Sequence, residues 1–188
     1  MKFFSVNILA FLFLLQLSFA NSDSEKEKSD KNFKHKESST IGLNNLVLSK
    51  KFSTDKENIK LEKLKLFFAL VPENAKIKIR IQEVDNQTKL PGKDINSNEI
   101  LFSPDKKYGW NTLELETQNI NIQNKEFYLT LECVNCVLPD FYSDAYLKQS
   151  LALAIDKKAK SEFLIRNYGQ ENWETMAAEP MIKLSYSK

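Results

Sequence analysis

Apolar and polar residues alternate one by one in several short segments of this chain. Residues 77–84 read IKIRIQEV, with isoleucine at every second position and basic or polar residues between them. Successive side chains of a β-strand point to opposite faces of its sheet, so this spacing predicts a strand with one apolar face and one polar face. The polar segment that follows ends in Pro91 and Gly92 and predicts a loop.

The same period of two recurs from residue 42 onward. We predict strands in residues 42–52, 64–71, 77–84, 99–102, 111–116, 126–134, 150–156, 162–168 and 181–187. Polar segments rich in Asn, Asp, Gly and Pro separate them, and residues 143–150 are the one serious candidate for a turn of helix. Eight or nine strands joined by polar loops predict an all-β fold, an antiparallel β-sandwich of the jelly-roll type.

The alternation also predicts which residues form the core. In residues 126–134 we place Tyr128, Thr130 and Glu132 on the solvent side, because the apolar residues occupy the positions between them. The residues expected to be buried together between the two sheets are Phe68, Ile79, Leu115, Phe127, Leu129 and Leu131.

The N-terminal segment predicts export. Lys2 precedes an apolar run, and small residues lead to a cleavage point after Ala20, so residues 1–20 are typical of a signal peptide. The run is short for a membrane span, although an uncleaved N-terminal anchor is the alternative. Residues 21–40 are charged and almost free of apolar groups, which predicts a disordered tether before a β-sandwich domain at residues 41–188. We expect the mature protein in the periplasm or outside the cell, without a membrane span.

The charge balance bears on the choice of partner. The formal net charge is only +2, and proteins that bind nucleic acid usually carry a concentrated basic face, so we expect no nucleic-acid partner. Lys63 and Lys65 on one predicted strand, and Lys78 and Arg80 on another, could form a basic surface for an anionic polysaccharide if the two strands are neighbours. The alternative is that these side chains belong to an ordinary solvated sheet face.

Two cysteines, Cys133 and Cys136, lie at the end of a predicted strand. A redox-active pair needs its first cysteine at a helix N-terminus, and a zinc site needs two more good ligands. A small local disulfide suits an oxidising compartment, and two reduced thiols are the alternative. We therefore expect no bound metal at this pair.

Catalytic patterns are absent from the sequence. The only histidine, His35, lies in the predicted tether, and no nucleophile elbow, zinc-protease motif or phosphate-binding glycine loop is present. Glu114, Glu116 and Glu132 fit the polar side of strands, although a glycosidase could bring two such carboxyl groups together across a cleft. We expect no cofactor, apart from a structural calcium ion that the loops at residues 84–88 and 103–109 could hold.

Aromatic residues in loops are the strongest candidates for ligand binding. Trp173 lies in the polar segment GQENWET, where core packing explains a tryptophan least well. Tyr142 and Tyr146 follow the cysteine pair and could join it, and Arg166 could hydrogen-bond a hydroxyl or carboxylate group of the ligand. The alternative for Trp173 is that it covers one end of the core. Trp110 precedes a predicted strand and is expected to be packed.

A set of strand and turn residues spread over the chain also follows a known order. It comprises Ile79, Ile81, Val84, Pro91, Gly92, Gly109, Trp110, Leu113, Leu115, Ile120, Ile122, Phe127, Leu129, Leu131 and Trp173. This order resembles the jelly-roll accessory domains of secreted Bacteroidota proteins, which often stand beside carboxypeptidase-regulatory-like domains. The resemblance spans residues 43–186 and implies a fold like that of carbohydrate-binding sandwiches. It implies no catalytic residue. The charged tether and the cysteine pair depart from the pattern.

These observations favour an exported, non-catalytic β-sandwich that binds a glycan or another ligand of the envelope or the extracellular space. A structural module that contacts another envelope protein is the alternative. A small glycosidase or lyase is the third hypothesis.

Overall fold

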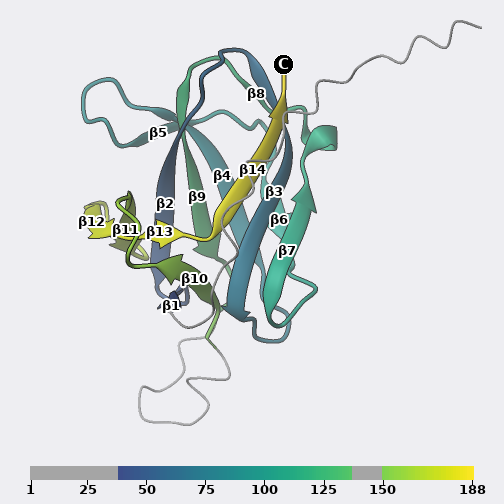
Figure 1. The fold of residues 1–188 in the computed structure, drawn as a ribbon, viewed down its shortest axis with the longest axis vertical. Helices are drawn as coiled ribbons and strands as arrows, with labels where there is room; N and C mark the ends of the chain where they lie inside the picture. The colour runs from purple at the N-terminus through teal and green to yellow at the C-terminus, as the bar shows by residue number, and fades with distance from the viewer. Residues whose placement is uncertain (1–37, 137–149) are drawn as a thin grey trace, which may run out of the picture.

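Two antiparallel β-sheets pack face to face in the computed structural model, which describes residues 38–136 and 150–188 (Figure 1). One sheet, here called the β3 sheet, contains β1 (Ser38–Gly42), β10 (Ala152–Asp156), β3 (Ile59–Leu70) and β14 (Ile182–Ser187) in that order, with β13 (Glu179–Pro180) paired to β10 and with β7 (Gly109–Glu114) and β8 (Asn121–Ile122) paired to β3. The other, the β9 sheet, contains β12 (Glu174–Ala177), β11 (Glu162–Asn167), β2 (Leu46–Ser53), β9 (Glu126–Cys133), β4 (Ile77–Val84) and β5 (Pro91–Asp94), with β6 (Ile100–Phe102) paired to β4.

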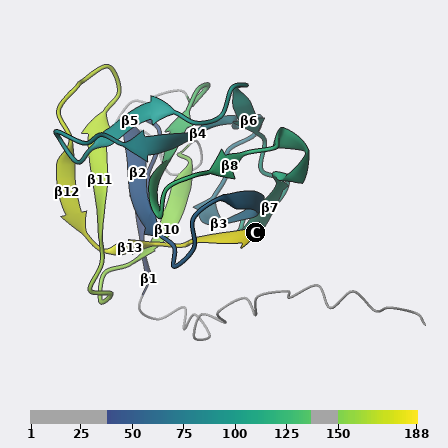
Figure 2. The same cartoon turned by 90° about the horizontal axis from the view of Figure 1, so that it is seen from above.

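Seen from above, the two layers are separate: β4, β5 and β6 lie on one side of the molecule, and β3 and β13 lie on the other (Figure 2). A short 3-10 helix, η2 (Glu116–Gln118), follows β7. The protein is therefore an all-β antiparallel sandwich, as the alternation of the sequence predicts. Each of the nine predicted segments overlaps a strand, although β3 begins five residues before the predicted segment at 64–71. The described residues add β1, β5, β8, β12 and β13, which are five residues long or shorter.

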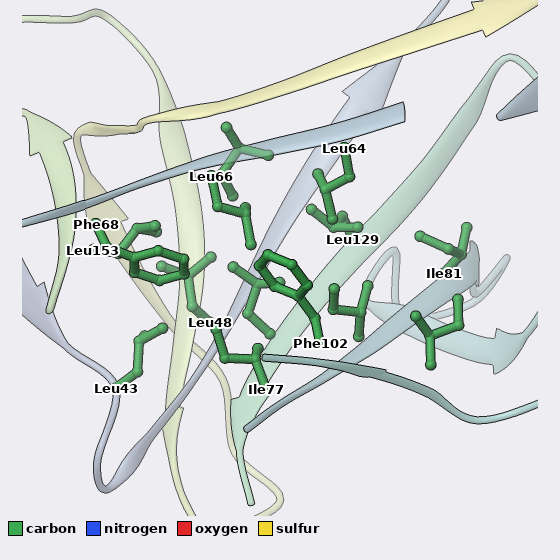
Figure 3. Close-up of a cluster of buried hydrophobic side chains, with 14 of the residues drawn as sticks. Leu43, Leu48, Leu64, Leu66, Phe68, Ile77, Ile81, Phe102, Leu129 and Leu153 are labelled. Atoms are coloured by element: carbon green, nitrogen blue, oxygen red, sulfur yellow. The ribbon is translucent and has the colours of Figure 1, made fainter. Parts of the chain in front are cut away.

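The core lies between the two sheets, as Figure 3 shows for side chains that include Leu48, Phe68 and Leu129. The six residues predicted to be buried together have exposed fractions of 0–1%, so the predicted apolar face is confirmed. Strands β4 and β9 contribute from one sheet and β3 from the other. Burial of this kind stabilises the fold by about 25 cal/mol for each Å² of apolar surface removed from water.

Strand β1 begins inside the segment that the sequence assigned to the tether. Residues 38–42 pair with β10 in antiparallel register, from Ser38 opposite Asp156 to Gly42 opposite Ala152. Ile41 is buried in this strand and anchors it, while the preceding polar residues contribute backbone hydrogen bonds to the sheet edge. The first described strand therefore starts three residues before the predicted domain boundary at residue 41.

The prediction that the second face of β9 points to solvent is wrong for two residues. Tyr128 and Thr130 are 5% and 1% exposed, although they alternate with the core residues. Thr130 lies in a chain of side-chain hydrogen bonds with Ser49 on β2 and Gln82 on β4, and both of those residues are also buried. These polar side chains can be buried because they form hydrogen bonds with one another in place of hydrogen bonds with water.

The proposed single basic face is also wrong. Lys63 and Lys65 lie on β3, whereas Lys78 and Arg80 lie on β4 in the other sheet, so the two pairs of cations cannot combine. Acidic partners lie close to these cations: Glu114 is 3.3 Å from Lys63, Glu99 is 2.8 Å from Lys78, and Asp94 is 2.9 Å from Arg80. These cations behave as the alternative predicted, as members of solvated sheet faces.

An ion pair and a disulfide complete the framework. Lys50 on β2 is 8% exposed and forms a salt bridge with Glu179 on β13, so the pair joins the two sheets at the edge of the core. Cys133 and Cys136 form a disulfide with a Cα–Cα distance of 5.6 Å, within the usual range for such bonds. The bridge closes the turn that follows β9.

Candidate functional site

The hairpin of β11 and β12 positions the residue that the sequence favoured for ligand binding. Antiparallel pairing places Ile165 opposite Glu174, and one further step of the same register places Arg166 opposite Trp173. The two side chains meet: the guanidinium carbon of Arg166 lies 4.8 Å from the centroid of the Trp173 ring. Gly169, with a φ of +78°, allows the turn between the two strands, because a side chain disfavours that backbone conformation.

Hydrogen bonds fix the position of the arginine. Its Nη1 donates to the carbonyl oxygen of Gln170 in the same hairpin, and Tyr168 donates its backbone N–H to the carbonyl of Asn45, which ties the hairpin to the start of β2. Arg166 and Trp173 are both half-buried, whereas Tyr168 is 63% exposed. The Nε of Arg166 is buried and has no hydrogen-bond partner among the residues that the structure describes. The hairpin thus presents an indole ring, a guanidinium group and an exposed phenol at one edge of the β9 sheet.

A shallow hollow lies on the same outer face of the β9 sheet. Antiparallel register aligns Leu164 on β11 with Ser49 on β2 and with Thr175 on β12, one row of side chains away from Arg166 and Trp173. The hollow has a volume of about 170 Å³, and its lining residues are Ser49, Lys51, Tyr128, Glu162, Phe163, Leu164 and Thr175. Sequence reasoning missed this feature because its residues come from four strands whose pairing is not visible in the alternation.

A chain of buried hydrogen bonds runs in one direction from Ser49, a lining residue of the hollow, to Gln82. Thr130 donates its hydroxyl hydrogen to the Gln82 side-chain oxygen at 2.7 Å, so Ser49, at 2.8 Å, must donate its own hydrogen to Thr130. The Gln82 amide in turn donates to the carbonyl of Gly92 at 2.9 Å. Ser49 has therefore used its one hydrogen, and its fully buried side chain supports the hollow from below.

The hairpin between β4 and β5 bounds this region beside Tyr128. The Tyr128 hydroxyl donates to the carbonyl oxygen of Lys89 at 2.8 Å, and burial raises the pKa of that hydroxyl above its usual value near 10. Asp85 begins the turn and accepts hydrogen bonds from the backbone N–H groups of Thr88 at 2.7 Å and Gln87 at 3.0 Å, and these bonds lower the pKa of its carboxyl group. A calcium ion in this loop would therefore compete with the turn for the Asp85 carboxylate.

The lysine and glutamate residues at the rim of the hollow differ in their partners. Lys51 forms an ion pair with Glu126 at 2.8 Å, and the hydrogen bond from Lys51 lowers the pKa of the Glu126 carboxyl group. Glu162 is exposed and has no ion-pair partner within the described part of the chain. The hollow thus combines a neutralised ammonium group, a carboxylate, hydroxyl oxygens and the apolar side chain of Leu164.

The second tryptophan lies on the opposite sheet. Trp110 on β7 packs against Phe67, with ring centroids 5.4 Å apart and the planes nearly perpendicular, and Lys183 lies over its ring at 5.0 Å. Trp110 is half-buried, and Phe67 beneath it is 7% exposed. Tyr108, also in contact with Phe67, is 54% exposed. This arrangement agrees with the prediction that Trp110 is packed.

The remaining sequence candidates fall into two groups. Tyr142, Tyr146 and most of the candidate helical turn at residues 143–150 lie outside the described residues. Glu114 is held by Lys63 on an exposed sheet face, and the carboxylates of the described segments form no group of three or more metal ligands. Within residues 38–136 and 150–188, no helix has the length and apolar character needed to cross a membrane.

Comparison with protein-family models and with curated proteins finds no match. Among solved structures, the chain is similar to the cysteine protease and lectin-like domains of a surface-layer-associated protein of Clostridium difficile, with a TM-score of 0.49 and 13% sequence identity. The match covers 80% of this chain and 36% of the other, so the present chain spans about a third of that protein's length. Similarity at this level carries no information about a shared activity.

Proposed function

We propose that this protein is an exported, non-catalytic β-sandwich module that binds a glycan through the outer face of the β9 sheet. The observation that carries the proposal is the pairing of Arg166 with Trp173 at the edge of that face. Sugar rings present apolar C–H surfaces that stack on an indole ring and hydroxyl groups that accept hydrogen bonds from a guanidinium group. Both groups lie on one hairpin, next to a hollow with a mixed polar and apolar lining.

Three further features support the proposal. The hairpin is tied to β2 by a backbone hydrogen bond, which fixes the geometry of the pair before a ligand arrives. Tyr168 adds an exposed aromatic ring at the same hairpin. The signal-like N-terminal segment and the disulfide between Cys133 and Cys136 support an oxidising compartment outside the cytoplasm.

Binding is favoured over acid–base catalysis because several carboxylates of the sheet faces are held in ion pairs. Arg80 holds Asp94 through two hydrogen bonds, and Lys51 and Lys78 hold Glu126 and Glu99. The hydrogen bond from Lys51 lowers the pKa of the Glu126 carboxyl group, which suits that group poorly for donating a proton to a leaving group. A shallow surface of this kind also predicts weak binding, because it buries little ligand area.

The test is a screen of the exported protein against immobilised neutral and acidic glycans, followed by titration of each glycan that binds. Trp173→Ala should abolish binding while leaving the thermal unfolding midpoint within a few degrees of the parent. Trp110→Ala is the matched control, because Trp110 is also half-buried under a cation but lies on the other sheet. If the two variants lose binding equally, or if no glycan binds, the glycan proposal fails and an assembly module that contacts an envelope protein replaces it.

A further inference from the structure

The hollow beside the Arg166–Trp173 pair has a composition that suits a second unit of the same ligand. We infer that it binds one neutral sugar residue, so that the full ligand of the β9 sheet is a neutral oligosaccharide that runs along the β11–β12 hairpin. This inference rests on the proposed function, because it extends the site at Trp173 by one neighbouring position. The expected ligand is a neutral glycan chain of at least two sugar units.

The spacing of the two positions supports a continuous chain. Thr175 follows Trp173 by two residues on the same strand side, and Leu164 precedes Arg166 by two residues on the partner strand. Two residues of a strand span about 7 Å, on the scale of the step between sugar units in a glycan chain. A ring stacked on Trp173 would therefore place the next part of the chain over Leu164 and the hollow.

The hydrogen-bonding groups of the hollow are mixed, as a sugar requires. Ser49 lies fully buried below the hollow with its hydrogen committed to Thr130, so the groups that a sugar can reach are those at the rim. Glu162 is an acceptor at the rim, Thr175 can donate and accept, and both side chains are exposed. Hydroxyl groups of a sugar both donate and accept, so they can satisfy both Glu162 and Thr175 while the ring covers Leu164.

The charges of the hollow favour a neutral sugar over an acidic one. Lys51 is the only cation in the lining, and Glu126 already pairs with it at 2.8 Å. Glu162 adds a carboxylate with no ion-pair partner among the described residues. A uronic acid or sulfated sugar placed here would meet a like charge without a compensating cation, and such a contact weakens binding.

The experiment is calorimetric titration of the exported protein with neutral gluco-, manno- and galacto-oligosaccharides of one to four units, and with trigalacturonate. The parent protein should bind the trisaccharide of one neutral series about tenfold or more tightly than the monosaccharide, and trigalacturonate more weakly than that trisaccharide. Thr175→Val and Glu162→Gln should remove most of this gain while leaving monosaccharide affinity within about twofold. Thr112→Val and Glu114→Gln, exposed positions on β7 of the other sheet, are the matched controls and should behave as the parent.

The outcomes separate the two proposals. If Trp173→Ala loses binding but Thr175→Val and Glu162→Gln match the parent at every chain length, the proposed function stands and the second position is wrong. Tighter binding of trigalacturonate than of every neutral trisaccharide would overturn the ligand class. If none of these sugars binds the parent protein, the second position fails together with the function on which it rests.

Discussion

The guanidinium carbon of Arg166 lies 4.8 Å from the centroid of the Trp173 ring, across the β11–β12 hairpin. The contact has two consequences for the site. It holds the indole in one orientation, since the arginine is itself anchored to Gln170. It also occupies part of the aromatic surface, so a ligand must use the remaining surface of the ring or displace the arginine.

The first prediction concerns the stability of the core. Phe127 is 1% exposed and stacks on Phe52, with ring centroids 5.7 Å apart and an interplanar angle of 16°. Phe127→Ala should lower the free energy of unfolding by about 3–5 kcal/mol, measured by chemical denaturation, because it leaves a cavity between the sheets. Phe52→Ala is the control and should cost less, because Phe52 is only half-buried. A loss below about 1 kcal/mol for Phe127→Ala would contradict the assignment of this face to the core.

The second prediction concerns the contribution of the Lys50–Glu179 ion pair to stability. Lys50→Met leaves the Glu179 carboxylate, which is partly exposed to water, without the cation that it contacts at the core edge, so stability should fall by about 1–3 kcal/mol. The double variant Lys50→Met/Glu179→Leu removes both charges and should regain most of that loss, because apolar residues of similar size replace a buried pair well. Equilibrium unfolding of the three proteins checks this. A double variant no more stable than Lys50→Met would show that the pair does not act as a unit.

Tyr128 makes a prediction about alkaline pH. Its raised pKa means that the folded protein holds the phenolic proton more tightly than the unfolded chain does. The stability from this group is therefore complete below about pH 10, the unfolded pKa, and is lost as the pH rises through the folded pKa. Tyr128→Phe also loses the hydrogen bond to Lys89, which contributes about 1 kcal/mol at neutral pH.

The two proteins should accordingly converge in stability as the solution becomes alkaline. Their free energies of unfolding, measured from about pH 8 to about pH 11, should differ most at the lower pH. A difference that stays constant over this range would mean that Tyr128 does not titrate with a raised pKa in the folded protein.

Much of the fold could be predicted from the sequence, because a strand with one buried face leaves a period of two. Ile77, Ile79 and Ile81 are each 0–1% exposed, as their spacing indicates. The strands that the sequence did not predict carry too few residues for a period to appear. β8 and β13 have two residues each, and β13 includes Pro180.

What the sequence could not show is which strands are neighbours. Lys65 and Lys78 have similar surroundings in the sequence, yet they lie on different sheets. Thr130 occupies a position that the alternation assigns to solvent. Its hydroxyl is nevertheless buried and hydrogen-bonded to Ser49 and Gln82, which lie far from it in the sequence. The hollow has the same origin, because Ser49, Glu162 and Thr175 meet only through strand pairing. The pairing of Arg166 with Trp173 is closer to the sequence prediction, because both residues are candidates for ligand binding there and a single hairpin joins them.

The most direct test of the central claim uses the two tryptophans of the chain as reporters. Each has one indole N–H resonance in a proton–nitrogen correlation spectrum, and the spectrum of Trp173→Ala assigns them. During titration with a glycan that the screen identifies, the Trp173 resonance should shift saturably and the Trp110 resonance should stay in place. A Trp110 shift with an unmoved Trp173 resonance, at glycan concentrations where calorimetry shows binding, would contradict a ligand site on the outer face of the β9 sheet.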